Sequence, residues 1–180
     1  VNPVADQQAN EDAVFSFTPP GNAFNDTDVG DALSYTATLS DGTALPTWLA
    51  FNPSTRTFTG TPGNADVGNL EVLVTATDTG GLSASDAFTL SVLNANDAPV
   101  VGTALVDQLA DEDSPFSFTV PAHVFADDDS IHGDTLTYAA TLADGSALPT
   151  WLGFDAVTRT FSGTPLNNDV GSLDVRVTAT

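Results

Sequence analysis

The chain is built from one module that occurs twice. Residues 31–77 align with residues 134–180 without a gap, and 32 of the 47 aligned positions are identical. Residues 6–28 align in the same way with residues 107–129, so the second copy has two extra residues in the loop that follows. A period of about 100 residues is typical of domains in a string and is too long for a solenoid of small units. We therefore expect two domains, at residues 1–97 and 98–180.

Each copy alternates short apolar strands with clusters of turn residues. Apolar side chains recur at every second position in Leu33–Leu39 and Leu70–Thr77, which is the spacing of a strand with one buried face. Seven such strands predict an all-β fold of tandem seven-stranded Greek-key β-sandwiches. The strands expected in the first copy are Val4–Gln8, Ala13–Thr18, Leu33–Leu39, Trp48–Phe51, Thr55–Gly60, Leu70–Thr77 and Ala84–Leu93.

The second copy supports the choice of buried face and lacks one strand. Arg176 replaces Leu73, which indicates that this side of the strand is exposed, while the apolar row on the other side is kept. Up to Thr180 the second copy has no counterpart of Ala84–Leu93. An incomplete sandwich exposes a strand edge. We expect that the polypeptide continues or that a neighbouring segment fills the gap.

The charge of the chain excludes several kinds of partner. Three arginines, no lysine and 24 acidic residues give a net charge of −21, and 21 of the acids are aspartate. Such a field repels nucleic acid and anionic membranes. Aspartate is a short oxygen ligand that suits both turns and hard cations. A cation is therefore the expected partner, and a generic acidic adaptation to salty surroundings is the alternative.

Several features that mark other protein classes are missing from the sequence. There is no cysteine, no apolar run that approaches about 18 residues, and no nucleophilic serine or phosphate-loop motif. We expect neither an enzyme nor a segment inserted in a membrane. The first residues contain no signal peptide and read like the middle of a longer polypeptide, so any targeting segment is expected elsewhere.

The acidic residues gather in the loops at the two ends of each sandwich. In strands that run alternately up and down, successive loops fall at opposite ends. One end of the first copy is expected to carry Glu11, Asp12, Asp41, Asp66, Asn96 and Asp97. The other end is expected to carry Asp26, Asp28, Asp31 and Asp78. The matching end of the second copy is expected to carry Asp127, Asp128, Asp129 and Asp134.

These groups of oxygen ligands predict calcium binding. Clustered carboxylates repel one another when no cation is present, and calcium takes six to eight oxygens, whereas magnesium requires stricter octahedral geometry. A short linker is expected to bring the two copies together so that calcium bridges them. Asp41, Asp144 and Asp155 are instead expected to be turn residues. The predicted calcium ligands are Asn2, Glu11, Asp26, Asp28, Asp66, Asp78, Asn96, Asp97, Asp127, Asp129 and Asp134.

Two sets of motifs resemble known families. Asp26-Thr27-Asp28, Asp127-Asp128-Asp129, Asp78-Thr79-Gly80-Gly81 and the linker Asn94–Pro99 resemble the calcium motifs of cadherin repeats. Leu45–Phe51, followed by Thr59-Gly60-Thr61-Pro62, resembles the dystroglycan-type cadherin-like and Ig modules of large bacterial surface adhesins. The resemblance implies an extracellular, calcium-binding β-sandwich repeat located at a cell surface.

The resemblance also implies specific ligands. The glutamate before the second strand in cadherins matches Glu11 and Glu112, and the aspartate of the Asp-Arg-Glu motif matches Asp66 and Asp169. The glutamate of that motif falls on Gly68 and Gly171, and the five-residue linker motif is only partly present in Asn94–Ala98. The resemblance therefore implies fewer and weaker calcium sites than in a full cadherin, with dissociation constants of about 10⁻⁴ to 10⁻³ M.

The expected function is that of a calcium-stiffened spacer that displays other modules, with homophilic contact to another such repeat as a further expectation. The alternative is a carbohydrate-binding module, because Trp48 and Trp151 occupy equivalent places and aromatic rings stack on sugars. Both tryptophans lie next to a proline and among leucine and phenylalanine residues, which favours a core position. The partners expected are calcium, neighbouring repeats of the chain, and polysaccharide or another adhesin module.

Overall fold

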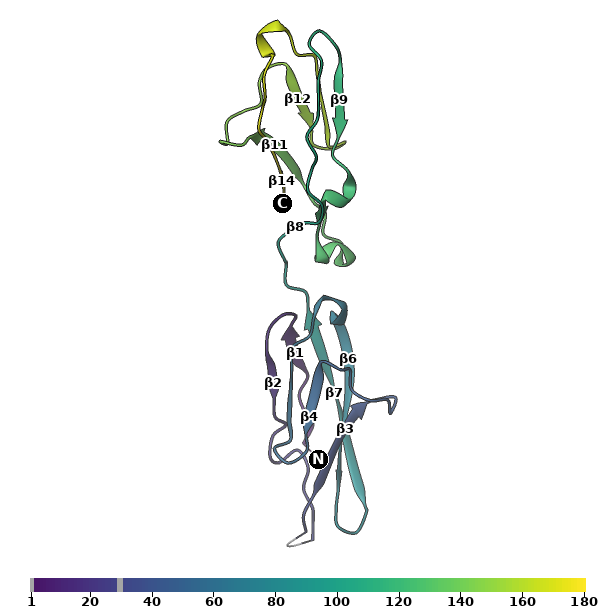
Figure 1. Ribbon diagram of the computed structural model, residues 1–180. Helices are drawn as coiled ribbons and strands as arrows, with labels where there is room; N and C mark the ends of the chain where they lie inside the picture. Colours follow the sequence, from purple (N-terminus) through teal and green to yellow (C-terminus); the bar gives the residue numbers. More distant parts are fainter. Residues whose placement is uncertain (1, 29–30) are drawn as a thin grey trace. The chain divides into compact units, whose positions relative to one another are not determined.

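The computed structural model describes residues 2–28 and 31–180. The chain folds into two units, unit 1 (Val1–Ala95) and unit 2 (Asn96–Thr180). The predicted all-β fold is confirmed, since the regular structure of the described residues consists of strands and short 3₁₀ turns (Figure 1). None of the helical segments in these ranges has the length and apolar character needed to cross a bilayer.

Unit 1 is a sandwich of two sheets. The larger sheet has the order β1 (Gln7–Asn10), β7 (Ser83–Leu93), β6 (Gly68–Thr77) and β3 (Ser34–Leu39). The smaller sheet has the order β2 (Phe15–Phe17), β5 (Thr57–Gly60) and β4 (Leu49–Asn52). Neighbouring strands are antiparallel except for β1 and β7, which run parallel.

All seven predicted strands of the first copy are present, but the first was placed too early. β1 begins at Gln7, whereas the apolar pattern predicted a start at Val4. The Val4 amide donates to the Asp86 carboxylate at 2.6 Å. Val4 is also 4% exposed and belongs to the core. The apolar signal at Val4 therefore reflects burial outside the β-ladder.

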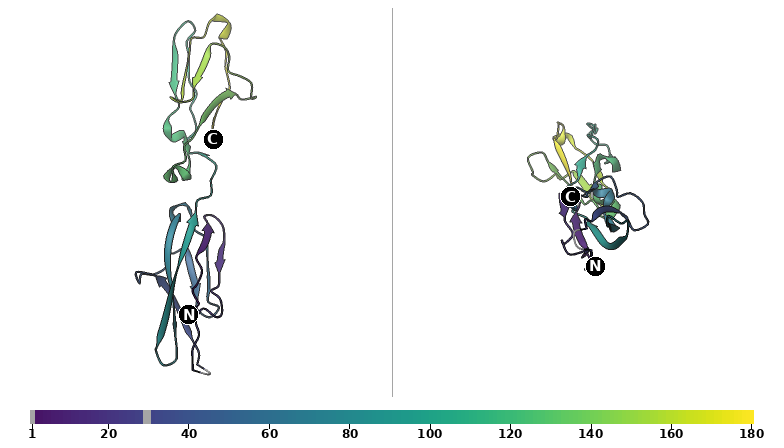
Figure 2. Two further views of the ribbon diagram at one scale, coloured as in Figure 1. Left: turned by 180° about the vertical axis from the view of Figure 1, so that it is seen from behind. Right: turned by 90° about the horizontal axis from the view of Figure 1, so that it is seen from below.

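The core of unit 1 forms between the inner faces of the two sheets. Alternate residues of β6 and β7 point inward, so that Val72 and Leu90 are fully buried beside Phe58 of the smaller sheet. β6 and β7 pair over ten residues, from Gly68 opposite Val92 to Thr77 opposite Ser83, and they run side by side in unit 1 (Figures 1 and 2). Burial of each such side chain stabilises the fold by about 1.5–3 kcal/mol.

The tryptophan and the Gly-Thr-Pro motif of each copy form one packing unit. Trp48 and Trp151 are half-buried and pack against the cores of their units. Gly60 lies opposite Leu49 across β4 and β5, and a Cβ at Gly60 would overlap the Trp48 carbonyl oxygen. Gly163 has the same relation to Trp151. The glycine of the motif therefore lets its main chain approach the tryptophan carbonyl closely. The same requirement in both units explains why the motif occurs in both copies.

Unit 2 repeats most of this architecture. Its strands are β8 (Val100–Val101) with β10 (Phe125–Ala126), the sheet β12 (Leu152–Asp155), β13 (Thr160–Gly163) and β9 (Phe116–Thr119), and the pair β11 (Tyr138–Leu142) with β14 (Val175–Ala179). Within residues 96–180 no strand corresponds to β7. Residues 108–111, which align with β1, form no strand either. The reason is that β1 of unit 1 pairs with β7, which has no counterpart there.

The close approach at the second motif predicts a large cost for any side chain there. Gly163→Ala should lower the free energy of unfolding of unit 2 by about 2 kcal/mol or more, since overpacking of a filled site typically costs about 1–3 kcal/mol. Gly153→Ala is the matched control, because its Cβ would meet only an ordinary contact with the Ser162 carbonyl oxygen and the first copy already has Ala50 there. Chemical denaturation measures both variants, and equal stabilities would contradict the packing argument.

Candidate functional site

Three aspartates meet at one end of unit 1. Ser34 of β3 pairs with Thr77 of β6, so the loop before β3 and the turn after β6 reach the same end of the sheet. Carboxylate oxygens of Asp26, Asp31 and Asp78 all lie within 4.8 Å of one another there. This is the only group of three potential metal ligands in the part of the chain that the structure describes.

Local hydrogen bonds hold these carboxylates in place. Asp26 Oδ1 accepts from the Asp28 amide at 2.8 Å, and Asp78 Oδ1 accepts from the Leu82 amide at 2.8 Å. The Thr79 hydroxyl donates to Asp31. Each aspartate therefore closes a turn or lies beside one, and these turns hold the three carboxylates close together.

The composition of this group differs in part from the ligands predicted. Asp26 and Asp78 are brought together as expected, whereas Asp28 is exposed and outside the group. Asp31 was placed at this end of the sandwich but was missing from the predicted ligands. Its signal was its position just before β3, which becomes informative once Ser34 is known to pair with Thr77. Asn2 is exposed, and its side-chain amide donates to the Asn22 carbonyl at 3.1 Å.

Glu11 is a buried acid at the opposite end of unit 1. It follows β1, is only 1% exposed, and its amide donates to the Leu93 carbonyl at 3.0 Å. Its Oε1 accepts from the Ala95 amide at 2.7 Å. Its Oε2 is buried and has no hydrogen-bond partner. A buried carboxylate with an unpartnered oxygen is costly unless a positive charge balances it, so this position is suited to a cation.

Asp66 lies in the segment next to Glu11. The Asp12 amide donates to the Pro62 carbonyl at 2.8 Å, which ties the residues after β1 to the approach to η1 (Asn64–Asp66). Asp66 is half-buried, and its Oδ2 accepts from the Gly63 amide at 2.9 Å. Among the described residues, neither Asp66 nor Glu11 belongs to a group of three acids whose carboxylate oxygens lie close together.

Asp129 is the buried acid of unit 2. It belongs to η3 (Asp128–His132) and is 0% exposed. Its Oδ2 accepts from the Asp97 amide at 2.5 Å, and its own amide donates to Asp127 Oδ1 at 2.9 Å. Its Oδ1 is buried without a partner. The Asp134 amide donates to the Asp129 carbonyl at 3.3 Å, so these predicted ligands of the second copy lie along one turn.

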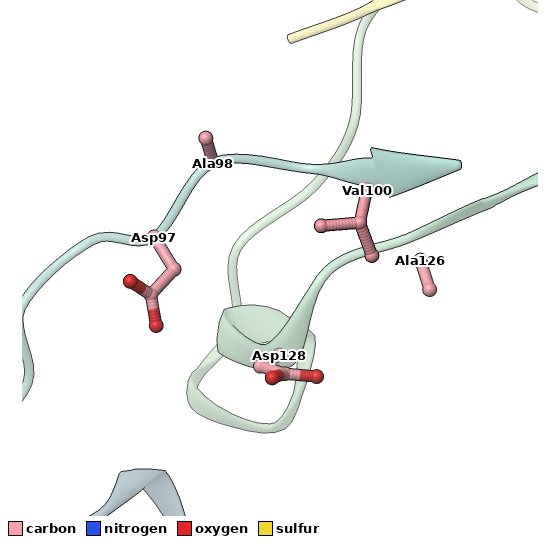
Figure 3. A pocket seen from close by; sticks show the side chains of 5 residues that line it. All are labelled: Asp97, Ala98, Val100, Ala126 and Asp128. Carbon is pink, nitrogen blue, oxygen red and sulfur yellow. The ribbon is translucent and has the colours of Figure 1, made fainter. Parts of the chain in front are cut away.

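A small pocket opens beside this turn. It has a volume of about 250 Å³ and is lined by Asp97, Ala98, Val100, Ala126 and Asp128. Figure 3 shows that Asp97 comes from the segment before β8 and Asp128 from η3. Asn96 is exposed beside it, and its side-chain amide donates to the Asp97 carbonyl at 3.0 Å. Asp97 and Asp128 give this pocket two acidic side chains.

Glu112 and Asp169, which the family resemblance paired with Glu11 and Asp66, differ in their surroundings. Asp169 Oδ2 accepts from the Leu166 amide at 2.9 Å, as Asp66 does from Gly63. Glu112 is exposed, whereas Glu11 is buried. The difference arises because the partners of Glu11 come from the end of β7 and the residues after it, which have no counterpart within residues 96–180.

The turn role predicted for Asp41, Asp144 and Asp155 is confirmed. Hydrogen bonds from the Thr43 hydroxyl and amide lower the pKa of Asp41, and those from Ser146 lower the pKa of Asp144. The amides of Thr158 and Val157 lower the pKa of Asp155 in the same way. These acids are satisfied by their own turns, which distinguishes them from Glu11 and Asp129.

Comparison with solved structures places the fold among cadherin repeats. A mouse cadherin-23 structure, EC22-24, matches with a TM-score of 0.58 and 16% identity over 100% of this chain and 57% of that chain. The protocadherin GammaB4 extracellular domain matches with a TM-score of 0.52 and 18% identity over 99% of this chain and 33% of that chain. At these identities the likeness shows the fold alone.

Comparison with curated proteins finds relatives among bacterial adhesins. The "Serine-rich adhesin for platelets" of Staphylococcus aureus strain MRSA252 is 32% identical over 138 residues, or 77% of this chain and 9% of that protein. The protein of the same name in strain USA300 matches over the same length, which is 5% of it. The chain thus spans a small part of the relatives it matches.

The repeat that organises the sequence also matches a family model. The model described as "Putative Ig domain" covers residues 1–93 and again residues 98–180. It therefore accounts for both copies of the module, including the second one without its last strand. The chain belongs to this Ig-domain family, of which it contains two tandem members with a cadherin-like β-sandwich fold.

Proposed function

We propose that the chain is a pair of non-catalytic, calcium-stabilised spacer repeats of a large adhesin located at a bacterial cell surface. The observation that carries the proposal is the burial of Glu11 and Asp129, each of which has a carboxylate oxygen without a hydrogen-bond partner. The similarity to staphylococcal adhesins supports the surface location and the adhesive context.

The charge balance of the chain supports an external cation. A buried carboxylate is stable when a neighbouring positive charge or a metal ion compensates it. The chain has no lysine and only three arginines against 24 acids, so its own side chains cannot supply that charge at every acidic group. Calcium accepts six to eight oxygens in flexible geometry, and carboxylates and main-chain carbonyls are its usual ligands in proteins.

The residues that would hold calcium come from the groups described above. In unit 1 they are Asp26, Asp31 and Asp78 at one end and Glu11 at the other. In unit 2 they are Asp127 and Asp129. Bound ions would remove the repulsion within each group and stiffen the turns that carry it. The sharing of calcium between the repeats stays a sequence-based prediction, as do homophilic contact and polysaccharide binding.

Calcium should stabilise the folded chain. Because a ligand that binds only the folded state stabilises it, 5 mM calcium should raise the unfolding free energy by about 2 kcal/mol per site if the dissociation constant is near 0.1 mM. The thermal midpoint should then rise by roughly 4–8 °C per kcal/mol, as expected for a domain of this size. Scanning calorimetry in calcium and in chelator, at equal ionic strength, measures the shift. The same midpoint in both would contradict calcium stabilisation.

Loss of one charge from the three-aspartate group should weaken calcium binding. Asp78→Asn keeps an acceptor for the Leu82 amide but removes a charged ligand. One class of sites should therefore lose at least about tenfold in calcium affinity, roughly the 1.4 kcal/mol that corresponds to a factor of ten. Asp41→Asn is the matched control, because it removes the same charge from a turn aspartate of unit 1. Isothermal titration calorimetry compares them, and identical isotherms for both variants would rule out this group as a site.

A further inference from the structure

An arginine stacks on a tyrosine ring at the same place in each unit. The Arg56 Cζ lies 5.4 Å from the centre of the Tyr35 ring, and the Arg159 Cζ lies 5.6 Å from the centre of the Tyr138 ring. The two arginines align with each other in the repeat, as do the two tyrosines. Such cation–π contacts stabilise a folded chain, most strongly where water is excluded. Two of the three arginines of the chain therefore make one repeated contact.

The contact joins the two sheets of each sandwich. Arg56 directly precedes β5 of the smaller sheet of unit 1, whereas Tyr35 belongs to β3 of the larger sheet. In unit 2, Arg159 directly precedes β13, and Tyr138 begins β11 in a different sheet. Both arginines are half-buried. Each guanidinium group therefore fixes the start of one strand against the opposite sheet.

The main chain of both arginines adopts a conformation that favours glycine. Arg56 has a φ of 58° and Arg159 has a φ of 56°, in the left-handed region. Among the described residues neither arginine forms an ion pair, and the Arg159 Nε atom is buried without a hydrogen-bond partner. A strained backbone position persists where the surrounding structure requires it. The stack on tyrosine is the contact that accounts for an arginine at this position in both copies.

In unit 1 the tyrosine also contacts the chain just before the three-aspartate group. The rings of Tyr35 and Phe24 meet edge to face, with their centroids 6.0 Å apart. Phe24 is 6% exposed and lies two residues before Asp26, and Tyr35 lies four residues after Asp31. The ring contact therefore joins the chain on either side of these two aspartates, and Arg56 supports it from the opposite sheet.

The same arrangement surrounds the acidic turn of unit 2. The rings of Tyr138 and Phe125 meet edge to face, and their centroids are also 6.0 Å apart. Phe125 lies two residues before Asp127, and Tyr138 lies four residues after Asp134. The segment between the rings has two more residues than in unit 1, yet the ring contact is the same. The aromatic contact, rather than the length of the segment, therefore sets the ends of the acidic turn.

We propose that Arg56 and Arg159 are positioning residues of the cation sites. Each arginine stacks on its tyrosine, keeps the aromatic pair in contact, and so holds the two ends of the acidic segment in place before an ion binds. A set of ligands that is already ordered binds more tightly, because less conformational entropy is lost on binding. Arg56 acts on Asp26 and Asp31, and Arg159 acts on the turn that carries Asp129. The inference rests on the calcium sites proposed above.

The charge of the arginine by itself would have the opposite effect. A guanidinium group near a calcium site repels the ion, so loss of the charge alone raises the calcium affinity. Loss of the aromatic contact disorders the carboxylates and lowers the calcium affinity. The direction of the change therefore separates a positioning role from a merely electrostatic one.

Arg56→Gly and Arg159→Gly test the proposal in the whole chain. Glycine suits the left-handed backbone but removes the stack, so the stability in chelator should change little while the calcium affinity falls. A calcium titration followed by NMR of the amides of Asp26, Asp31 and Asp129 gives the affinity of each unit. Arg56→Gly should weaken calcium binding in unit 1 by at least about threefold and leave unit 2 unchanged, and Arg159→Gly should do the reverse.

Arg176→Gln is the matched control. It removes the same charge from an exposed arginine, whose Nη2 donates to the Ala143 carbonyl at 2.6 Å, and it should weaken calcium binding in neither unit. Calcium shifts that saturate in the original chain, together with equal or higher affinity in the glycine variants, would overturn the positioning role. A loss in Arg176→Gln as large as in the glycine variants would overturn it too. Chemical denaturation in chelator checks that all variants are folded.

A second measurement separates this proposal from calcium binding itself. In chelator, the backbone order parameters of Asp26 and Asp31 should fall in Arg56→Gly from about 0.85, a value typical of rigid backbone, toward about 0.6. NMR relaxation reports them. If the original chain shows no saturable calcium shifts, the proposed calcium sites are wrong, and the relaxation data decide the role of Arg56. Unchanged order parameters would overturn the positioning role whether or not calcium binds.

Discussion

Buried negative charge is the constraint on which the rest of this structure depends. Glu11 and Asp129 are among the most deeply buried side chains of their units, and each keeps a carboxylate oxygen that no hydrogen bond reaches. A chain with a net charge of −21 has few positive groups to place beside them. The interior of each sandwich is ordinary and apolar, so the unusual chemistry is confined to the sheet ends. A cation at those ends is the simplest way to reconcile burial with charge.

The β-sandwich creates these sites through strand register. The pairing of β3 with β6 sets Asp31 beside Asp78. In the turn after β6, the Thr79 hydroxyl donates to Asp31 and the Leu82 amide donates to Asp78. Asp41 and Asp144 also accept hydrogen bonds within their own turns, but neither belongs to a group of three acids among the described residues. The three-aspartate group therefore differs from a turn aspartate in that separate segments of the chain meet there, which is a property of the fold.

Much of this arrangement could be predicted from the sequence, because the two copies of the module can be compared with each other. The repeat identified the module, and short apolar segments between turn clusters, with clear alternation in some of them, predicted all seven strands of the first copy. The predicted start at Val4 was wrong, because Val4 is buried without pairing in a strand. Asp31 was missed because its closeness to Asp78 depends on the register of β3 against β6. The different burial of Glu11 and Glu112 was also beyond sequence reasoning, since it depends on residues at and after the end of β7, about 80 residues further along the chain.

The central claim is that the buried carboxylates are balanced by calcium, and carbon-13 NMR of the Glu11 and Asp129 side-chain carboxyl groups tests it most directly. The signals would be followed through a calcium titration of the whole chain, with the carboxyl groups of Asp41 and Asp144 as internal references. The account predicts saturable shifts at Glu11 and Asp129 and little change at the two turn aspartates. Signals from Glu11 and Asp129 that do not move, or that move no more than those of the turn aspartates, would contradict it.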